Sequence, residues 1–130
     1  MNYILLINQP EDYHVSGFIY YKDNNDYLCS SSDNGYINIW DLYNKTIFKV
    51  INTNGCLLAH IIEWNKKYII VADYNNKIFK IIDIEKNNLI NNINSEHKDK
   101  LVSIKKINHP IYGESLLSAG NDKTIKLWVI

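Results

Sequence analysis

The sequence predicts an all-β protein made of repeated four-stranded units, on the strength of three observations. β-branched and aromatic residues dominate its apolar positions, which favours strands over helices. Clusters of turn-forming residues arrive about every ten residues, as they do when short strands follow one another. One short pattern of residues also occurs three times along the chain, and self-similarity at a fixed period is typical of repeat architectures.

The repeated pattern is clearest between Leu116 and Trp128. It begins with a short apolar run, continues through a polar turn from Gly120 to Lys123, and ends in alternating polar and apolar residues. This order is typical of a β-hairpin. Residues 28–41 repeat it closely and residues 70–83 more weakly, so that Trp40, Ile82 and Trp128 occupy equivalent places at intervals of 42 and 46 residues.

Strands and turns can be assigned in order along the whole chain. We expect one domain, 1–130, with units at 11–51, 52–93 and 94–130, and with residues 1–8 as a strand that completes another unit. The predicted strands are 3–7, then 17–21, 27–31, 36–41 and 46–51, then 57–64, 68–72, 77–83 and 89–93, and finally 101–107, 115–118 and 124–129. Turns are expected at 23–26, 33–35, 43–45, 65–67, 75–76 and 85–88, and the longest internal loop of the third unit at 107–113, around Pro110.

Composition narrows the classes of partner and compartment. Fourteen basic residues balance fourteen acidic ones, so no net charge attracts the chain to nucleic acid or to an anionic membrane. No apolar run approaches the roughly 18 residues that a membrane span needs. The two cysteines, Cys29 and Cys56, are too few for the disulfide framework of a small secreted domain, which predicts a cytoplasmic, or else nuclear, location.

The sequence of the third unit resembles the repeat pattern of the WD-repeat family. The matching residues there are His97, Asp99, Leu101, Val102, Ser118, Asp122 and Trp128. The first unit retains His14, Ser30, Trp40 and Asp41, with Asn34 where the family has an acid, and the second retains Asp83 but has Ala72, Asn76 and Ile82 at the other places. The resemblance implies a β-propeller with blades of four antiparallel strands.

About three blades fit into the chain, and this is fewer than the four to eight of a typical propeller. If strand 3–7 completes the last set, the strands make three full blades. Two blade faces are then left uncovered. Three explanations remain open: the chain is part of a larger propeller, it associates with copies of itself, or it adopts an unusual open arrangement.

His97, Ser118 and Asp122 are also the residue types of a hydrolytic triad. The resemblance implies instead a buried chain of hydrogen bonds from Trp128 to Ser118, to His97 and to Asp122, in which the hydroxyl cannot reach a substrate. His14, Ser30, Asn34 and Trp40 are expected to repeat this network in the first unit, with a weaker neutral acceptor at Asn34. The second unit, with Ala72, Asn76 and Ile82 at these places, is expected to lack the network and to be a plainer, apolar blade.

We expect no metal and no cofactor. The four histidines show no ligand spacing with one another or with the cysteines. The five glycines form neither GxxxxGK[ST] nor GxGxxG, so a phosphate-binding loop is not predicted.

The resemblance also implies a surface that binds proteins or peptides around the narrow opening of the propeller. The residues that match its positions are Val15, Gly17, Asp33, Asn54, Cys56, Asn75, Lys98, Lys100 and Asn121. The sequence therefore predicts a non-catalytic scaffold for protein–protein interaction. Two alternatives stay open: a targeting tail of an enzyme whose catalytic domain lies outside these residues, and an independent hydrolase that uses His97 and Ser118.

Overall fold

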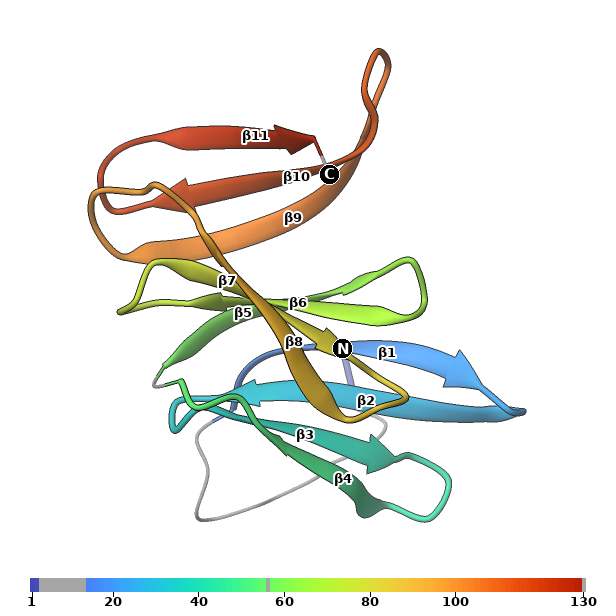
Figure 1. The fold of residues 1–130 in the computed structure, drawn as a ribbon. Coiled ribbons are helices and arrows are strands. Elements are labelled where there is room, and N and C mark those ends of the chain that lie inside the picture. Colours follow the sequence, from blue (N-terminus) through green and yellow to red (C-terminus); the bar gives the residue numbers. More distant parts are fainter. Residues whose placement is uncertain (3–13, 56, 130) are drawn as a thin grey trace.

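The computed structural model describes residues 1–2, 14–55 and 57–129, which form eleven strands in three antiparallel sheets and no helix (Figure 1). The first sheet contains β1 (His14–Lys22), β2 (Asn25–Ser32), β3 (Tyr36–Asp41) and β4 (Thr46–Asn52). The second contains β5 (Leu58–Trp64), β6 (Tyr68–Asp73), β7 (Ile78–Asp83) and β8 (Asn88–Asn94). The third contains β9 (Leu101–His109), β10 (Gly113–Gly120) and β11 (Ile125–Val129).

The predicted fold class is confirmed, because consecutive strands pair in each sheet and the three sheets form an open stack. Each of these eleven strands overlaps a strand expected from the sequence. The remaining predicted strand, 3–7, lies outside the described residues. Among the described residues β11 pairs only with β10, so the third sheet has three strands there.

Two predicted connections prove shorter than expected. Asp23 and Asn24 both have positive φ angles, 51° and 61°, which is the geometry of a two-residue hairpin turn. Asn25 and Asp26 therefore already pair with β1, and the turn does not extend to residue 26 as predicted.

The loop expected at 107–113 is mostly strand. β9 continues to His109 and β10 begins at Gly113, which pairs with His109, so that a long hairpin extends beyond the sheet (Figure 1). Pro110 lies at the tip, where its missing N–H breaks no ladder bond. His109 Nδ1 accepts hydrogen bonds from the N–H groups of Ile111 and Tyr112, at 3.1 and 3.3 Å, and this satisfies the turn.

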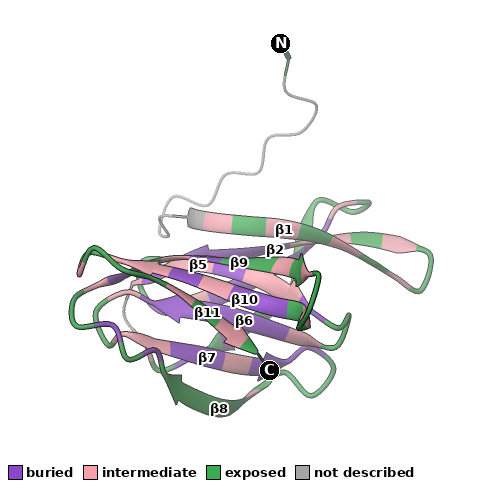
Figure 2. Cartoon of the chain, turned by 90° about the horizontal axis from the view of Figure 1, so that it is seen from above, coloured by how far each residue is buried: buried purple, intermediate pink, exposed green. Residues whose placement is uncertain are grey.

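The hydrophobic core consists of two layers, one on each side of the second sheet. Successive residues of a strand point to opposite faces, so Ile69 and Val71 of β6 pack toward the first sheet while Ile70 and Ala72 pack toward the third. Figure 2 shows buried residues along β6, β7 and β10, whereas β8 is largely exposed. The side chains of β6 therefore contribute to both core layers and pack against both neighbouring sheets.

Candidate functional site

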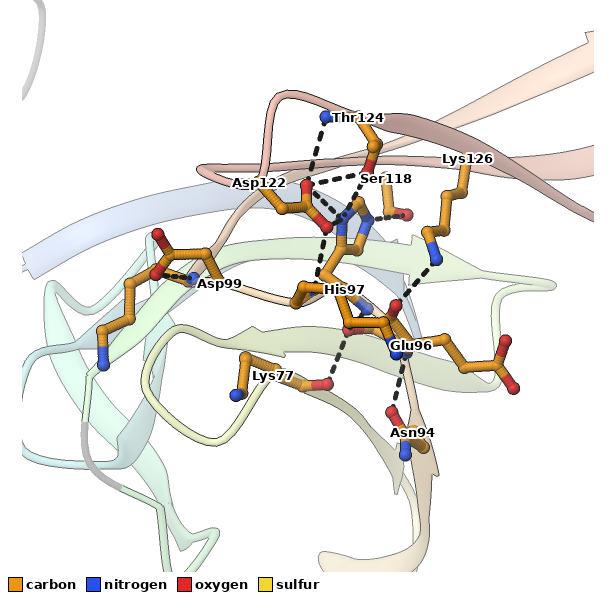
Figure 3. Close-up of polar contacts among 12 residues, drawn as sticks. Lys77, Asn94, Glu96, His97, Asp99, Ser118, Asp122, Thr124 and Lys126 are labelled. Atoms are coloured by element: carbon orange, nitrogen blue, oxygen red, sulfur yellow. Dashed lines mark hydrogen bonds and ion pairs between the residues drawn. The ribbon is translucent and has the colours of Figure 1, made fainter.

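A continuous chain of hydrogen bonds joins four side chains of the third sheet and of the segment that leads into it. Figure 3 shows three of them, Ser118, His97 and Asp122. Trp128 Nε1 donates to Ser118 Oγ at 2.8 Å, and Ser118 Oγ lies 2.8 Å from His97 Nε2. His97 Nδ1 lies 3.0 Å from both carboxylate oxygens of Asp122. The indole and the hydroxyl are donors, so His97 accepts at Nε2 and donates from Nδ1.

Asp122 collects more hydrogen bonds than any other member of this network. Its carboxylate accepts from the Lys98 N–H at 2.8 Å, from the Thr124 hydroxyl at 2.7 Å and from the Thr124 N–H at 3.1 Å. Burial acts to raise the pKa of Asp122, but these hydrogen bonds and that of His97 outweigh it and hold the pKa well below the usual range. The carboxylate therefore fastens the β10–β11 turn to the segment between β8 and β9.

Gly120 gives the imidazole its space. A Cβ at this position would lie 2.7 Å from His97 Nδ1 and 3.0 Å from Asp122 Oδ1. Gly120 is the last residue of β10, directly before the turn that carries Asp122. Position 120 therefore requires a residue without a side chain, because the His97 imidazole lies against the strand there.

The first sheet contains the corresponding contact between strands. Trp40 Nε1 donates to Ser30 Oγ at 3.1 Å, as its register across β2 and β3 allows. Asn34 accepts a hydrogen bond from the Ser32 hydroxyl through its amide oxygen. His14 begins β1, and its side chain lies outside the described residues, as do the side chains of Val15 and Cys56.

The second sheet carries a buried polar pair that the sequence did not predict. Ala72 and Ile82 are buried and apolar, as predicted for this unit. The expectation that the blade is apolar is wrong at two other positions, because Lys80 and Asp73 are both buried and their charged groups lie 3.8 Å apart. Asp73 also accepts from the Asn76 N–H and amide at 3.2 and 3.0 Å, so the carboxylate organises the β6–β7 turn.

A second interaction missed by the sequence reasoning links the inner strands of two sheets. His60 Nδ1 on β5 lies 2.9 Å from Ser103 Oγ and accepts from the Ile104 N–H on β9 at 3.1 Å. Burial lowers the pKa of His60, which favours the neutral ring that can accept these bonds. No motif marked His60, because its partners are 43 and 44 residues away.

The geometry offers little for catalysis. Ser118 is 1% exposed, and its oxygen is held between Trp128 and His97. A nucleophile needs an open approach for the reacting atom. Among the described residues no three His, Cys, Asp or Glu side chains lie close enough together to bind a metal ion. The described part of the chain also contains no helix that is long and apolar enough to cross a membrane.

The residues predicted for protein binding gather at one end of the stack. Backbone hydrogen bonds between adjacent connections bring the turns together: Thr53 to Gly35 at 3.1 Å, and Asn121 to Lys100 at 2.8 Å. This end lies at the left of Figure 1. The described predicted residues located there are Asp33, Asn54, Asn75, Lys98, Lys100 and Asn121.

Most of these residues are accessible. Asp33, Asn54, Asn75, Lys98 and Asn121 are exposed, Lys100 is half-buried, and Gly17 on β1 is exposed. Asn121 also donates from its amide to the Tyr74 hydroxyl at 3.4 Å, which connects the turns of the second and third sheets. The structure thus presents polar side chains from all three sheets on one surface.

Comparisons with known proteins bear on the fold. The family model described as WD domain, G-beta repeat matches residues 11–41 and 90–129, together more than half of the chain. The structure of U3-55K has a TM-score of 0.74 and 14% identity over 95% of this chain and 38% of that one. The crystal structure of RRP9 WD40 repeats gives the same values, with 37% of that chain covered. A comparison with curated proteins finds no match. At this identity the structural likeness shows the fold alone, and this chain spans less than two fifths of each of those structures.

Proposed function

We propose that this chain, which belongs to the WD domain, G-beta repeat family, is a non-catalytic scaffold segment that mediates protein–protein interactions. The observation that carries this proposal is the surface at one end of the stack, where exposed polar residues of three sheets lie on rigid turns. Such residues on a fixed framework suit recognition of a protein or peptide. The proposed partners are therefore proteins or peptides, and neither nucleic acid nor a membrane is proposed.

The absence of catalysis is part of the same proposal. Its support is the enclosure of Ser118 within the hydrogen bonds of Trp128 and His97, which leaves its oxygen no access to a substrate. We assign this network the role of tying the β8–β9 connection to β10 and β11. A cytoplasmic location is proposed with it, and the buried free thiol of Cys29 fits a reducing compartment.

We also propose that the working molecule contains further blades, supplied by a larger propeller or by a second copy. Large apolar side chains are exposed on the two outermost sheets, among them Ile19 and Val50 on the first and Ile125 and Val129 on the third. Exposed apolar surface of this kind favours association. Sedimentation of the purified chain tests this: a monodisperse monomer at micromolar concentration would contradict it.

Charge reversal tests the binding surface directly. The double variant Asp33→Lys/Lys100→Glu should lose proteins that the wild-type chain captures, as quantified by mass spectrometry. The matched control is Asp26→Lys/Lys86→Glu, which reverses one acid and one base away from that end and should retain them. Equal capture by all three chains would count against the proposed surface.

A further inference from the structure

A cavity of about 700 Å³ opens between the second and third sheets, beside the polar network. It is lined by the β6–β7 turn, by the segment between β8 and β9, and by β11. The side chains that surround it include Lys77, Lys98 and Lys126 together with Glu96, and Ile78 adds an apolar wall. Apart from Lys98, none of these residues belongs to the surface predicted from the sequence.

The local charge differs from that of the whole chain. Acidic and basic residues balance over the full sequence, but three lysines and one glutamate line this cavity. Among the described residues, neither the Lys77 nor the Lys98 ammonium has an acidic partner within 4 Å. The cavity therefore presents an uncompensated positive charge to solvent.

The walls of this cavity are held in place before any ligand arrives. The Lys77 carbonyl accepts from the Ser95 N–H at 3.1 Å and from its hydroxyl at 2.6 Å, which joins the β6–β7 turn to the β8–β9 segment. The Lys126 ammonium donates to the Glu96 carbonyl at 2.7 Å (Figure 3). Preformed contacts of this kind reduce the ordering that binding requires.

We infer that this cavity binds an acidic peptide segment that carries spaced carboxylates. The three lysines come from three separate chain segments, the β6–β7 turn, the β8–β9 connection and β11. An extended peptide with several carboxylates can contact lysines of all three segments, and for this reason we infer it in preference to a single compact anion. Ile78 can contact an apolar side chain between the acids. This inference rests on the proposed scaffold function and names its partner class.

Fluorescence anisotropy with a labelled decapeptide of alternating Glu and Ala tests the inference on the full chain. We expect saturable binding that weakens as salt rises from 50 to 200 mM, because the attraction is between partly exposed charges. The variant Lys77→Gln/Lys98→Gln should bind about tenfold more weakly. If this variant is unfolded by circular dichroism, Lys98→Gln alone should show a loss of about threefold.

The matched control is Lys45→Gln/Lys86→Gln. Lys45 has a positive φ of 58°, close to the 60° of Lys77, but lies on the β3–β4 turn of another sheet, so this variant should change affinity by less than about twofold. The same peptide with Gln in place of Glu should not bind. Three results would each overturn the inference. The first is equal affinity of the wild type and the cavity variants, the second is undetectable binding of the Glu peptide, and the third is binding only of a phosphoserine peptide. Capture that depends on Asp33 and Lys100 could survive such a result, because neither residue lines the cavity.

Discussion

The ammonium group of Lys80 lies 3.8 Å from the carboxylate of Asp73, and the two side chains are 4% and 0% exposed. Lys80 pairs across the strands with Val71, whose side chain is in the core shared with the first sheet. The ion pair therefore lies on the face of the second sheet that packs against the first. There Gly55 approaches it so closely that an added Cβ would be 2.9 Å from Asp73 Oδ2.

Removing only the lysine should destabilise the fold. Lys80→Met leaves the Asp73 charge buried without its counter-ion, and we expect a loss of about 3 kcal/mol in the free energy of unfolding. Urea denaturation measures this. The double variant Asp73→Asn/Lys80→Met should recover more than half of the loss, since it removes both charges. A single variant as stable as the wild type would contradict the role of the pair.

Ser118→Ala should lower stability without affecting any ester hydrolysis. The change leaves the half-buried Trp128 N–H and the buried His97 Nε2 without their shared partner, and an unmet buried polar group typically costs about 1–3 kcal/mol. Thermal unfolding measures the stability, and p-nitrophenyl acetate turnover measures the hydrolysis. Loss of a measurable esterase activity at unchanged melting temperature would support the hydrolase alternative instead.

The Asp122 carboxylate should make the free energy of unfolding depend on pH in the acidic range. Its pKa is lower in the folded chain than in the unfolded one, so its contribution is complete above the unfolded pKa of about 3.9 and is lost as pH falls below that value toward the folded pKa. Urea unfolding should show wild type and Asp122→Asn differing most at pH 6 and converging toward pH 3. A constant difference over that range would show that the carboxylate charge is not what matters.

His60 should add a second pH dependence, in a higher range. Its pKa is lowered in the folded chain, so the unfolded chain takes up the proton more readily, and stability falls as pH drops below about 6.5. Protonation at Nδ1 would also end the hydrogen bond from the Ile104 N–H. Between pH 7.5 and 5.5 the wild type should therefore lose more unfolding free energy than His60→Gln. An equal loss in both would exclude this histidine as the cause.

Gly120→Ala should disturb the network by displacing the imidazole. The added methyl group would lie 2.7 Å from His97 Nδ1, and overpacking of this kind usually costs about 1–3 kcal/mol. The same substitution in a His97→Ala background should cost clearly less, because the methyl then has room. A double-mutant cycle of unfolding free energies checks this, and equal costs in both backgrounds would show that the imidazole is not the obstacle.

Local chemistry explains why the strands could be predicted so fully. Alternating apolar residues and frequent turn formers act over a few residues, so β3 and its neighbours were visible in the sequence. The predicted turns were too long where strand pairing continued into residues that usually form turns. The hairpin around Pro110 is the example, because His109 satisfies the turn and the ladder continues almost to its tip.

The sequence alone determined the all-β class and the repeat period, because both follow from the local pattern of strands and turns and from its recurrence along the chain. Its resemblance to the WD-repeat family implied the approach of His97, Ser118, Asp122 and Trp128. Only the tertiary structure decided which polar groups are buried where the sheets meet: the ion pair of Lys80 and Asp73 within the second sheet, the bridge from His60 to β9, and the lysine-lined cavity. These depend on which faces of neighbouring sheets meet and on how deeply they bury a charge. Packing in three dimensions sets both, and no pattern within one strand encodes them.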